Sequence, residues 1–270
     1  MDLGLQGKVC VVAGGSRGIG HACAATLAAE GAQVIVVGRD RARLERAAGE
    51  VARHAADAER AVLPLACDLT APDAPARIAQ AVAQTGAGAP WGLVVAAGAT
   101  RARPLDELPD EVWEEQWRLH VIAPLRLLRS VCPAMAEEGG GRVVVVGSSA
   151  GRRPSATLDP SYSVTKAAQH ALARTFADRY AARGVNVNVV APGPVEGELW
   201  AGPGGLAEEI ARRQGTSVDA VLEATRRRSP TGRMTSADEV AALCALLLSP
   251  RVTNATGAVY ALDGGAVAAF

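Results

Sequence analysis

The sequence predicts an α/β fold in which one doubly wound parallel sheet of about seven strands forms the core of a single domain, residues 1–270. Short β-rich runs alternate with amphipathic helical patterns along the chain. The β-rich runs are apolar on both faces, as expected for strands that lie between two layers of helices. Hydrophobic residues make up 49% of the chain, which is enough for a large core. This alternation favours parallel strands with helices on both faces of the sheet.

The elements can be placed in order from these patterns. The expected strands are 8–13, 33–37, 61–66, 91–96, 142–147, 185–191 and 258–262. The expected helices lie between them, at about 18–30, 40–56, 72–85, 110–138, 160–183 and 236–248. The rhythm breaks once, over 192–232, where Gly, Pro and charged residues are frequent and helices are expected near 206–214 and 217–228. An insertion of this length, near 194–230, favours a lid over a substrate site rather than a linker.

The composition excludes several classes of partner. Basic and acidic residues balance at 28 each and the pI is about 6.9, so charge gives no argument for nucleic acid or an anionic membrane. The five cysteines stand in apolar surroundings without metal-ligand spacing, which predicts reduced core thiols in a cytoplasmic protein and no metal site. The N-terminus is typical of a first strand rather than a signal peptide. No apolar run approaches the roughly 20 residues of a membrane span.

A glycine-rich turn, AGGSRGIG, follows the first expected strand and opens the first expected helix. Glycines let the backbone turn tightly and approach a pyrophosphate, which then lies on the helix N-terminus. The spacing is G-x-x-x-G-x-G rather than the commonest dinucleotide-binding pattern, and a purely structural turn is the alternative. The position between a strand and a helix favours nucleotide binding. The residues expected at the cofactor are Gly14, Ser16, Arg17, Gly18, Ile19 and Gly20.

The end of the second expected strand bears on the choice between NAD and NADP. NAD-binding proteins place an acidic residue there to accept hydrogen bonds from the ribose hydroxyls. This chain has Gly38 at that position, followed by Arg39 and Asp40. Arg39, together with Arg17 of the glycine-rich turn, suits a 2′-phosphate. We therefore expect NADP, with NAD less favoured. The alternative is that both arginines are solvated and that Asp40 only caps the next helix.

A tyrosine and a lysine stand near the start of the helix expected after the fifth strand, in the run YSVTK. Tyr162 and Lys166 are four residues apart and share one helix face. A neighbouring cation favours the phenolate, which makes a side chain with an ordinary pKa near ~10 usable for proton transfer to a carbonyl or hydroxyl oxygen. Lys166 is one of only two lysines among 28 basic residues. Upstream, Ser148 and Ser149 follow the fifth strand, and either hydroxyl is placed to donate to a substrate carbonyl.

Together the glycine-rich turn, the S-x-A-G run that starts at Ser148 and the Y-x-x-x-K run resemble the short-chain dehydrogenase/reductase family over nearly the whole chain. The insertion is similar to the lid of reductases of the 3-oxoacyl carrier-protein type. The resemblance implies a Rossmann fold, an NAD(P)-dependent oxidoreductase that acts on CH–OH and C=O groups, and a homotetramer or homodimer.

The resemblance also implies roles for single residues. Ser148 is the catalytic serine, Tyr162 the general acid/base, and Lys166 the residue that positions the cofactor ribose and lowers the tyrosine pKa. The further cofactor contacts that it implies are Asp68, Leu69, Ala97, Gly98, Pro192, Gly193 and Val195, with Tyr162 and Lys166 themselves. Family residues are replaced at Ala13, Val95, Ala96 and Gly197, which is expected to loosen the grip on the cofactor.

The chain departs most from the family in the run WRLHVIAPLRLL. The fourth catalytic residue of the family, an asparagine, aligns with His120. Pro124 has no backbone N–H, so the carbonyl of His120 loses its intrahelical partner. The resemblance implies that this oxygen holds a water that leads from the lysine toward solvent. His120 is then either a member of the proton relay, since imidazole titrates near neutral pH, or a tolerated side chain at a helix kink.

Four arginines stand in loops expected at the substrate side of the sheet: Arg101, Arg103, Arg152 and Arg153. One hypothesis is that they attract an anionic group, such as a carboxylate or the phosphate of a carrier-bound acyl chain. The alternative is that they are scattered, solvated side chains. Leu199, Trp200 and Leu206 of the lid are expected to form an apolar wall.

The sequence therefore predicts an NADPH-dependent ketoreductase that transfers hydride to a carbonyl of a small or acyl- or polyketide-like substrate, with Tyr162 as the general acid/base. Its partner is expected to be a small carbonyl or alcohol compound. Two other functions stay open. One is an NADP-binding scaffold with little turnover, and the other is a non-redox use of the site, such as epimerisation or dehydration.

Overall fold

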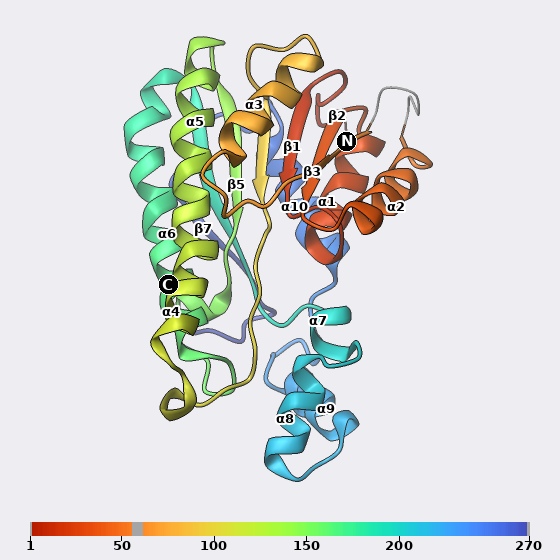
Figure 1. Cartoon of the computed structure of the whole chain (residues 1–270), viewed down its shortest axis with the longest axis vertical. Helices are drawn as coiled ribbons and strands as arrows, with labels where there is room; N and C mark the ends of the chain where they lie inside the picture. The colour runs from red at the N-terminus through yellow and green to blue at the C-terminus, as the bar shows by residue number, and fades with distance from the viewer. Residues whose placement is uncertain (1, 56–61, 269–270) are drawn as a thin grey trace.

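The computed structural model describes residues 2–55 and 62–268, which form a seven-stranded parallel sheet with helices on both faces (Figure 1). The strand order is β3-β2-β1-β4-β5-β6-β7, and every neighbouring pair is parallel. The strands are β1 Val9–Ala13, β2 Gln33–Gly38, β3 Val62–Ala66, β4 Gly92–Val95, β5 Gly141–Val146, β6 Val185–Pro192 and β7 Val259–Leu262. The predicted fold class, a single-domain Rossmann fold with about seven parallel strands, is confirmed.

The helices agree with the predicted segments, with one interruption and one addition described below. They are α1 Gly18–Ala29, α2 Arg41–Ala52, α3 Ala74–Gln84, α4 Asp110–Trp117, α5 Ala123–Glu137, α6 Pro160–Tyr180, α7 Glu198–Ala201, α8 Leu206–Gln214, α9 Val218–Arg227 and α10 Ala237–Leu248. Residue 56 of the helix predicted at 40–56 and residue 61 of the strand predicted at 61–66 lie outside the described residues.

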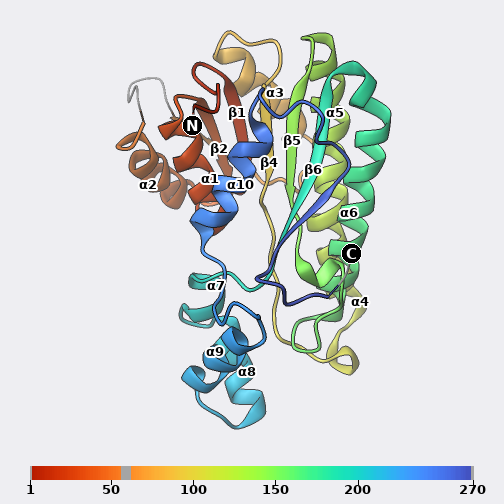
Figure 2. The ribbon, with the colours of Figure 1, turned by 180° about the vertical axis from the view of Figure 1, so that it is seen from behind.

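Two helix layers enclose the sheet (Figures 1 and 2). Helices α1, α2 and α10 pack on one face, and α3, α5 and α6 pack on the other. Side chains of the central strands alternate between the layers because successive residues of a strand point to opposite faces. In β1, Val11 joins the α5 layer, whereas Cys10 and Val12 join the α1 layer. All five cysteines are free and buried, as predicted for core thiols.

The two edge strands differ from the prediction that every strand is buried on both faces. Strands β1, β4, β5 and β6 are fully buried, but β3 and β7 are not. Each of these two has a neighbour on one side only, so part of it remains in contact with solvent. The apolar pattern of a strand therefore identifies the strand but does not show how deeply it is buried.

The helix predicted at 110–138 is interrupted. A π-helical segment, Arg118–Ile122, stands between α4 and α5. Pro124 lies in the first turn of α5, where a residue without an N–H is accommodated. The N–H of Ala123 reaches back five residues to the carbonyl of Arg118, which produces the wider π turn. The break expected from Pro124 is thus a π bulge, and it contains His120.

This helical stretch also corrects the expectation about membrane spans. By length and composition alone, Asp110–Glu137 is long and apolar enough to cross a membrane. Half of its apolar window is buried inside the fold, where α5 packs between the sheet and its neighbouring helices. That burial is typical of a core helix.

The insertion predicted near 194–230 forms a small helical unit beside the carboxyl ends of the strands (Figure 2). Helices α8 and α9 match the predicted helices at 206–214 and 217–228, whereas the short α7 is an addition. Trp200, Leu206 and Met234 belong to a separate apolar cluster inside this lid. The chain enters and leaves the lid at one place, because Val195 and Thr235 form a parallel β-bridge.

Candidate active site

A large cavity, of about 610 Å³, opens at the carboxyl ends of the central strands. The strand order reverses between β1 and β4, and open α/β sheets bind ligands in the crevice at such a point. The predicted cofactor residues that line this cavity are Gly14, Ser16, Arg17, Gly18, Ile19, Gly20, Arg39, Asp68, Leu69, Ala97, Gly98, Tyr162, Pro192, Gly193 and Val195. Lys166 is the one member of the predicted set that does not line it.

The glycine-rich turn forms a cradle in which side chains have no room. Gly14 has a φ of +93°, and a Cβ there would lie 2.6 Å from the backbone nitrogen of Ala97. A Cβ on Gly20 would collide with the carbonyl of Gly14. Gly18 has a φ of +53° and nothing within 4 Å of its Cβ position, so the start of α1 is open to the cavity. These residues fit a pyrophosphate, whose oxygens the first N–H groups of the helix are placed to bind.

The far end of the cavity, after β2, carries the guanidinium of Arg39 together with the carboxylate of Asp68. Gly38 and Arg39 line it. A Cβ on Gly38 would already lie 3.3 Å from each of two neighbouring side chains, which leaves little room for an acidic residue. Asp40 turns to its own helix and accepts the N–H of Arg43 at 3.0 Å, so its role as the cap of α2 is confirmed. Arg39, the residue that follows β2, is therefore the positively charged side chain at this end.

Two further cofactor residues have partners within the protein. Arg17 lies 3.6 Å from Glu198 at the start of α7, with both side chains more than half exposed, so the pair is weak and Arg17 can turn to a ligand. Asp68 accepts the N–H and the hydroxyl of Thr70, both at 2.9 Å. These bonds, the N–H first, lower the pKa of Asp68, which is therefore a carboxylate at the cavity wall.

Ser148 and Tyr162 meet at the cavity. The hydroxyl oxygen of Ser148 accepts the N–H of Ala150 at 3.1 Å, which leaves its proton free to donate. Burial raises the pKa of Tyr162, and the hydrogen bond with Ser148 opposes that rise. Ser149 also lines the cavity, but Ser148 is the serine that contacts the tyrosine. Of the two serines that the sequence left open, the geometry favours Ser148.

Lys166 lies behind the cavity wall and is 3% exposed. Its Nζ donates to the carbonyl of Val146 at 2.8 Å and to Oε1 of Gln169 at 2.9 Å. It stands 5.7 Å from the centroid of the Tyr162 ring, and burial lowers the pKa of Lys166 to about 7. Burial is the largest influence on the pKa of Tyr162 and raises it, and the lowering by Lys166 that the family resemblance implies stays a prediction.

His120 is 0% exposed, and its ring stands edge-on to Tyr162 with the centroids 5.4 Å apart. Its Nε2 accepts the N–H of Ala99 at 3.3 Å, and its Nδ1 lies 3.0 Å from Oγ1 of Thr165. The Thr165 hydroxyl points its proton at a backbone carbonyl one turn earlier, so Nδ1 carries the imidazole proton and donates. Burial, and then the charge of Lys166, hold the pKa of His120 well below its ordinary value. This neutral ring links the π bulge, the loop after β4 and α6.

The carbonyl of His120 has no donor from Pro124, as predicted, and it has a protein partner that the sequence did not indicate, whereas the water implied by the resemblance stays a prediction. Nε2 of Gln169 donates to this oxygen at 3.1 Å. Sequence patterns do not single out Gln169 or its neighbour His170. Gln169 stands three residues after Lys166, and His170 stands four residues after it. That spacing places them on the same buried face of α6 as Lys166. The spacing is the feature of the sequence from which their place beside Lys166 could have been predicted.

The arginines predicted at the substrate side fall into two groups. Arg101 lies 3.0 Å from Glu209 of the lid, and Arg103 lies 3.6 Å from the buried carboxylate of Asp159. Neither lines the cavity, nor does Arg152. Arg153 does line it. Of the four residues, Arg153 is therefore the one that the structure brings to the cavity.

The lid supplies the outer wall of the cavity. The apolar wall predicted from Leu199, Trp200 and Leu206 is confirmed, and Leu158 and Met234 extend it. The lid also contributes Arg228, at the end of α9, which sequence patterns do not indicate. Arg153 of the body and Arg228 of the lid therefore line the same cavity.

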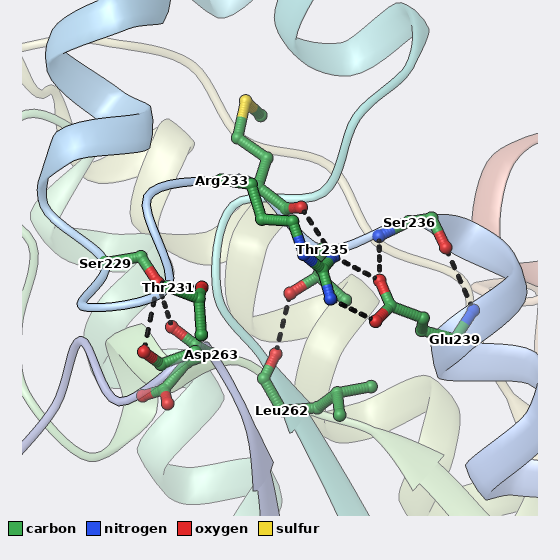
Figure 3. Close-up of polar contacts among 10 residues, drawn as sticks. Ser229, Thr231, Arg233, Thr235, Ser236, Glu239, Leu262 and Asp263 are labelled. Carbon is green, nitrogen blue, oxygen red and sulfur yellow. Dashed lines mark hydrogen bonds and ion pairs between the residues drawn. The ribbon is translucent and has the colours of Figure 1, made fainter.

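Figure 3 shows how the returning end of the lid is fastened to the body. Thr235 donates to the carbonyl of Leu262 at 3.0 Å, at the end of β7. Arg233 pairs with both carboxylate oxygens of Glu239 in α10, at 2.7 and 2.6 Å. Glu239 and Ser236 complete a capping box at the start of α10. The Arg233 hydrogen bond and the Ser236 N–H hold the pKa of Glu239 at about 2. This end of the lid is therefore anchored to β7 and α10.

The parallel sheet, the glycine cradle at the start of α1 and the meeting of Ser148 with Tyr162 define a nucleotide-dependent oxidoreductase. Residues 8–203 match the family model described as short chain dehydrogenase, and the chain belongs to this family.

Relatives of this chain are named as dehydrogenases and reductases. A galactitol 2-dehydrogenase (L-tagatose-forming) of Cereibacter sphaeroides is 34% identical, over 97% of this chain and 95% of that one. A rhamnolipids biosynthesis 3-oxoacyl-(acyl-carrier-protein) reductase of Pseudomonas aeruginosa is 31% identical, over 97% and 96%. The crystal structure of L-sorbose reductase from Gluconobacter frateurii, complexed with NADPH and L-sorbose, superposes with a TM-score of 0.91 at 31% identity and covers 100% of both chains. The family resemblance inferred from the motifs is confirmed, and the chain is an oxidoreductase of this family.

Proposed function

We propose that this protein is an NADPH-dependent ketoreductase that reduces the carbonyl group of a small molecule to an alcohol. The observation that carries the proposal is the contact between the Ser148 hydroxyl and the Tyr162 phenol, at the wall of a cavity that also contains the glycine cradle. A proton donor, a hydrogen-bond donor and a pyrophosphate site thereby share one cavity. This is the combination that the reduction of a carbonyl requires.

Tyr162 donates its phenolic proton to the substrate oxygen. Burial raises the pKa of Tyr162, which keeps the phenol protonated and suits it to act as an acid in the reducing direction. Ser148 donates a hydrogen bond to the same oxygen as negative charge develops on it. The Lys166 ammonium, 5.7 Å from the ring, stabilises the phenolate that remains. Bound NADPH would supply the hydride that reduces the carbonyl carbon.

We assign His120 to positioning. Both ring nitrogens are engaged, Nε2 with Ala99 and Nδ1 with Thr165, so the ring holds the loop after β4 against the helix that carries Tyr162. The low pKa of His120 agrees with this assignment, because burial keeps the imidazole neutral and its two nitrogens fixed as one donor and one acceptor.

NADP is the cofactor that the site favours. Arg39 lines the end of the cavity after β2, Gly38 leaves little room for an acidic side chain, and Asp40 is used as a helix cap. Arg17 adds a second guanidinium from the glycine-rich turn. The NADPH bound in the L-sorbose reductase structure supports the same choice.

The substrate that we propose has an apolar portion and an anionic group. Leu158, Leu199 and Trp200 form a wall suited to an acyl- or polyketide-like chain. Arg153 and Arg228 stand at the same cavity for a carboxylate or a carrier phosphate. The relatives named for galactitol and L-sorbose favour a polyol or ketose as the competing class of substrate.

We further propose a cytoplasmic homotetramer or homodimer. Trp117 of α4 and Val164 of α6 are 44% and 48% exposed, which favours a buried interface at these helices. Light scattering of Trp117→Lys beside the parent protein tests this assembly: the parent should be an oligomer and the variant a smaller species, whereas a monomeric parent would overturn the proposal.

The test of the function is NADPH oxidation with a panel of acyl, polyketide-like and ketose carbonyl compounds. We expect turnover with at least one class, and a loss of kcat of roughly 10²–10⁴-fold in Tyr162→Phe. Tyr260→Phe, at a tyrosine in the edge strand β7, is the matched control and should keep full activity. Full activity of Tyr162→Phe would refute the role of Tyr162. Binding of NADPH without turnover on any compound would favour the scaffold or the non-redox reading.

A further inference from the structure

Gln169 joins two parts of the site that the mechanism above treats separately. Its side chain is 1% exposed, on the buried face of α6. Its Oε1 accepts a hydrogen bond from the Lys166 ammonium at 2.9 Å, and its Nε2 donates a hydrogen bond to the carbonyl of His120 at 3.1 Å. One amide therefore connects the charge beside Tyr162 to the π bulge between α4 and α5.

The π bulge is what makes this connection available. Because Pro124 lacks an N–H, the carbonyl of His120 has no helical donor, and a buried carbonyl without a partner is costly. Gln169 supplies the donor from another helix. Its amide is suited to both neighbours, since it presents an acceptor to the ammonium and a donor to the carbonyl. Hydrophobic residues of the same size satisfy neither group.

The amide of Gln169 is neutral, so it does not compensate the positive charge of Lys166. The titratable groups that face Lys166 are Tyr162 and His170 on α6 itself and His120 from the π bulge. The pKa values of both histidines are lowered, so neither brings a charge near pH 7. Among the described residues, burial is the influence that acts on the pKa of Lys166. Hydrogen bonds from the ammonium to Val146 and Gln169 oppose that effect, because they favour the charged form.

We propose that Gln169 is a positioning residue for Lys166: its amide fixes the ammonium against the π bulge and keeps it protonated next to Tyr162. The catalytic consequence of this arrangement rests on the proposed function, whereas the coupling between Gln169 and Lys166 does not.

The coupling can be read without turnover, because the chain contains only two lysines, Lys8 and Lys166. Protein labelled with 13C at lysine Cε gives two signals, which Lys166→Arg assigns, and Lys8 serves as an internal reference. We expect Gln169→Met, which keeps the length but removes both hydrogen bonds, to lower the titration midpoint of Lys166 by about one pH unit. Gln84→Met, at the exposed end of α3, is the matched control and should leave the midpoint unchanged.

Gln169→Ala separates hydrogen bonding from packing. It removes more atoms than Gln169→Met, but the space it leaves is lined by an ammonium and a carbonyl, so a water can bridge them. We expect the Lys166 midpoint of this variant to lie between those of the parent and Gln169→Met. Its kcat should fall less than the roughly tenfold loss expected for Gln169→Met. This order is the opposite of what loss of packing predicts.

An unchanged Lys166 midpoint in both variants overturns the proposal, whatever happens to kcat, because a purely structural role lowers activity without moving that titration. If Gln169→Met does not fold, Gln169→Ala decides by the same criterion. A shifted midpoint in a protein that reduces no carbonyl compound would uphold the coupling and refute the proposed function, so the two failures are distinguishable.

Discussion

His170 holds the turn that carries Ser148: its Nε2 accepts the backbone N–H of Ser148 at 3.4 Å. The imidazole occupies space that two glycines leave, since a Cβ on Gly147 would collide with Nε2 and one on Gly151 would lie 2.8 Å from Cε1. Only an unprotonated nitrogen can accept this bond. Burial, followed by nearby positive charges, lowers the pKa of His170 to about 4, so the acceptor is available at neutral pH.

This neutral histidine should make the protein lose stability in acid. A histidine in the unfolded chain takes up its proton near pH 6.5, whereas His170 in the folded protein does so near 4. Between these values the unfolded state binds more protons, so the free energy of unfolding falls as the pH drops, by up to roughly 3 kcal/mol. Urea unfolding between pH 7 and pH 4 measures this slope. His170→Gln, which keeps an acceptor but does not titrate, should show a flatter curve; equal slopes would contradict the prediction.

Arg39 should determine the preference for NADPH. A charge-assisted hydrogen bond to a phosphate is worth about 1.5–3 kcal/mol, so Arg39→Ala should raise the KM for NADPH by roughly 10- to 100-fold. The KM for NADH should change little, because that cofactor has no 2′-phosphate. Arg41→Ala, at an exposed arginine two residues later in α2, is the control. Steady-state kinetics with both cofactors decides, and a parent enzyme that prefers NADH would sink the assignment.

Arg153 and Arg228 should recognise an anionic group on the substrate. With an acyl substrate that carries a carboxylate or phosphate, Arg153→Ala and Arg228→Ala should each raise KM by roughly tenfold. The matching neutral ester should be unaffected. Arg101→Ala, whose guanidinium pairs with Glu209 and stands outside the cavity, is the matched control. Equal KM values for the charged and neutral substrates in all variants would remove the anionic group from the proposal.

His120→Asn should retain the pH profile of the parent. The ring is neutral and both of its nitrogens are engaged, so it contributes geometry rather than a titration. Asparagine can still accept the N–H of Ala99, and a loss of kcat of less than tenfold is expected, whereas His120→Ala should lose more. The profile of kcat/KM from pH 5 to pH 9 is the measurement. If the pKa of either limb of this profile shifts in His120→Asn, the imidazole takes part in the proton relay and the prediction is wrong.

Most of the fold could be predicted from the sequence because its elements are long and strongly patterned. Alternating strands and helices specify the parallel sheet, and the glycine-rich turn locates its ligand-binding edge. What the pattern does not contain is the position of a strand within the sheet. The exposure of β3 and β7 follows from their place at the two edges, which depends on pairing between distant segments.

The site was predictable where its chemistry depends on one motif and unpredictable where it depends on contacts between helices. Tyr162, Lys166 and Ser148 stand in recognisable runs. Gln169 does not, because its importance arises only when α6 packs beside the π bulge. The arginines show the same limit: Arg101 and Arg153 occur in similar loop sequences, and only the lid, through Glu209, distinguishes them.

The β-bridge between Val195 and Thr235 makes the lid a segment that can be replaced as a unit. Its two ends are already joined, so a replacement segment has to match the short distance across that bridge and the contact between Glu209 and the loop that carries Arg101. The sheet, the glycine cradle and the proton donor lie outside the replaced part. Transplanting the corresponding segment of a relative would therefore change which substrates enter while the chemical step stays the same.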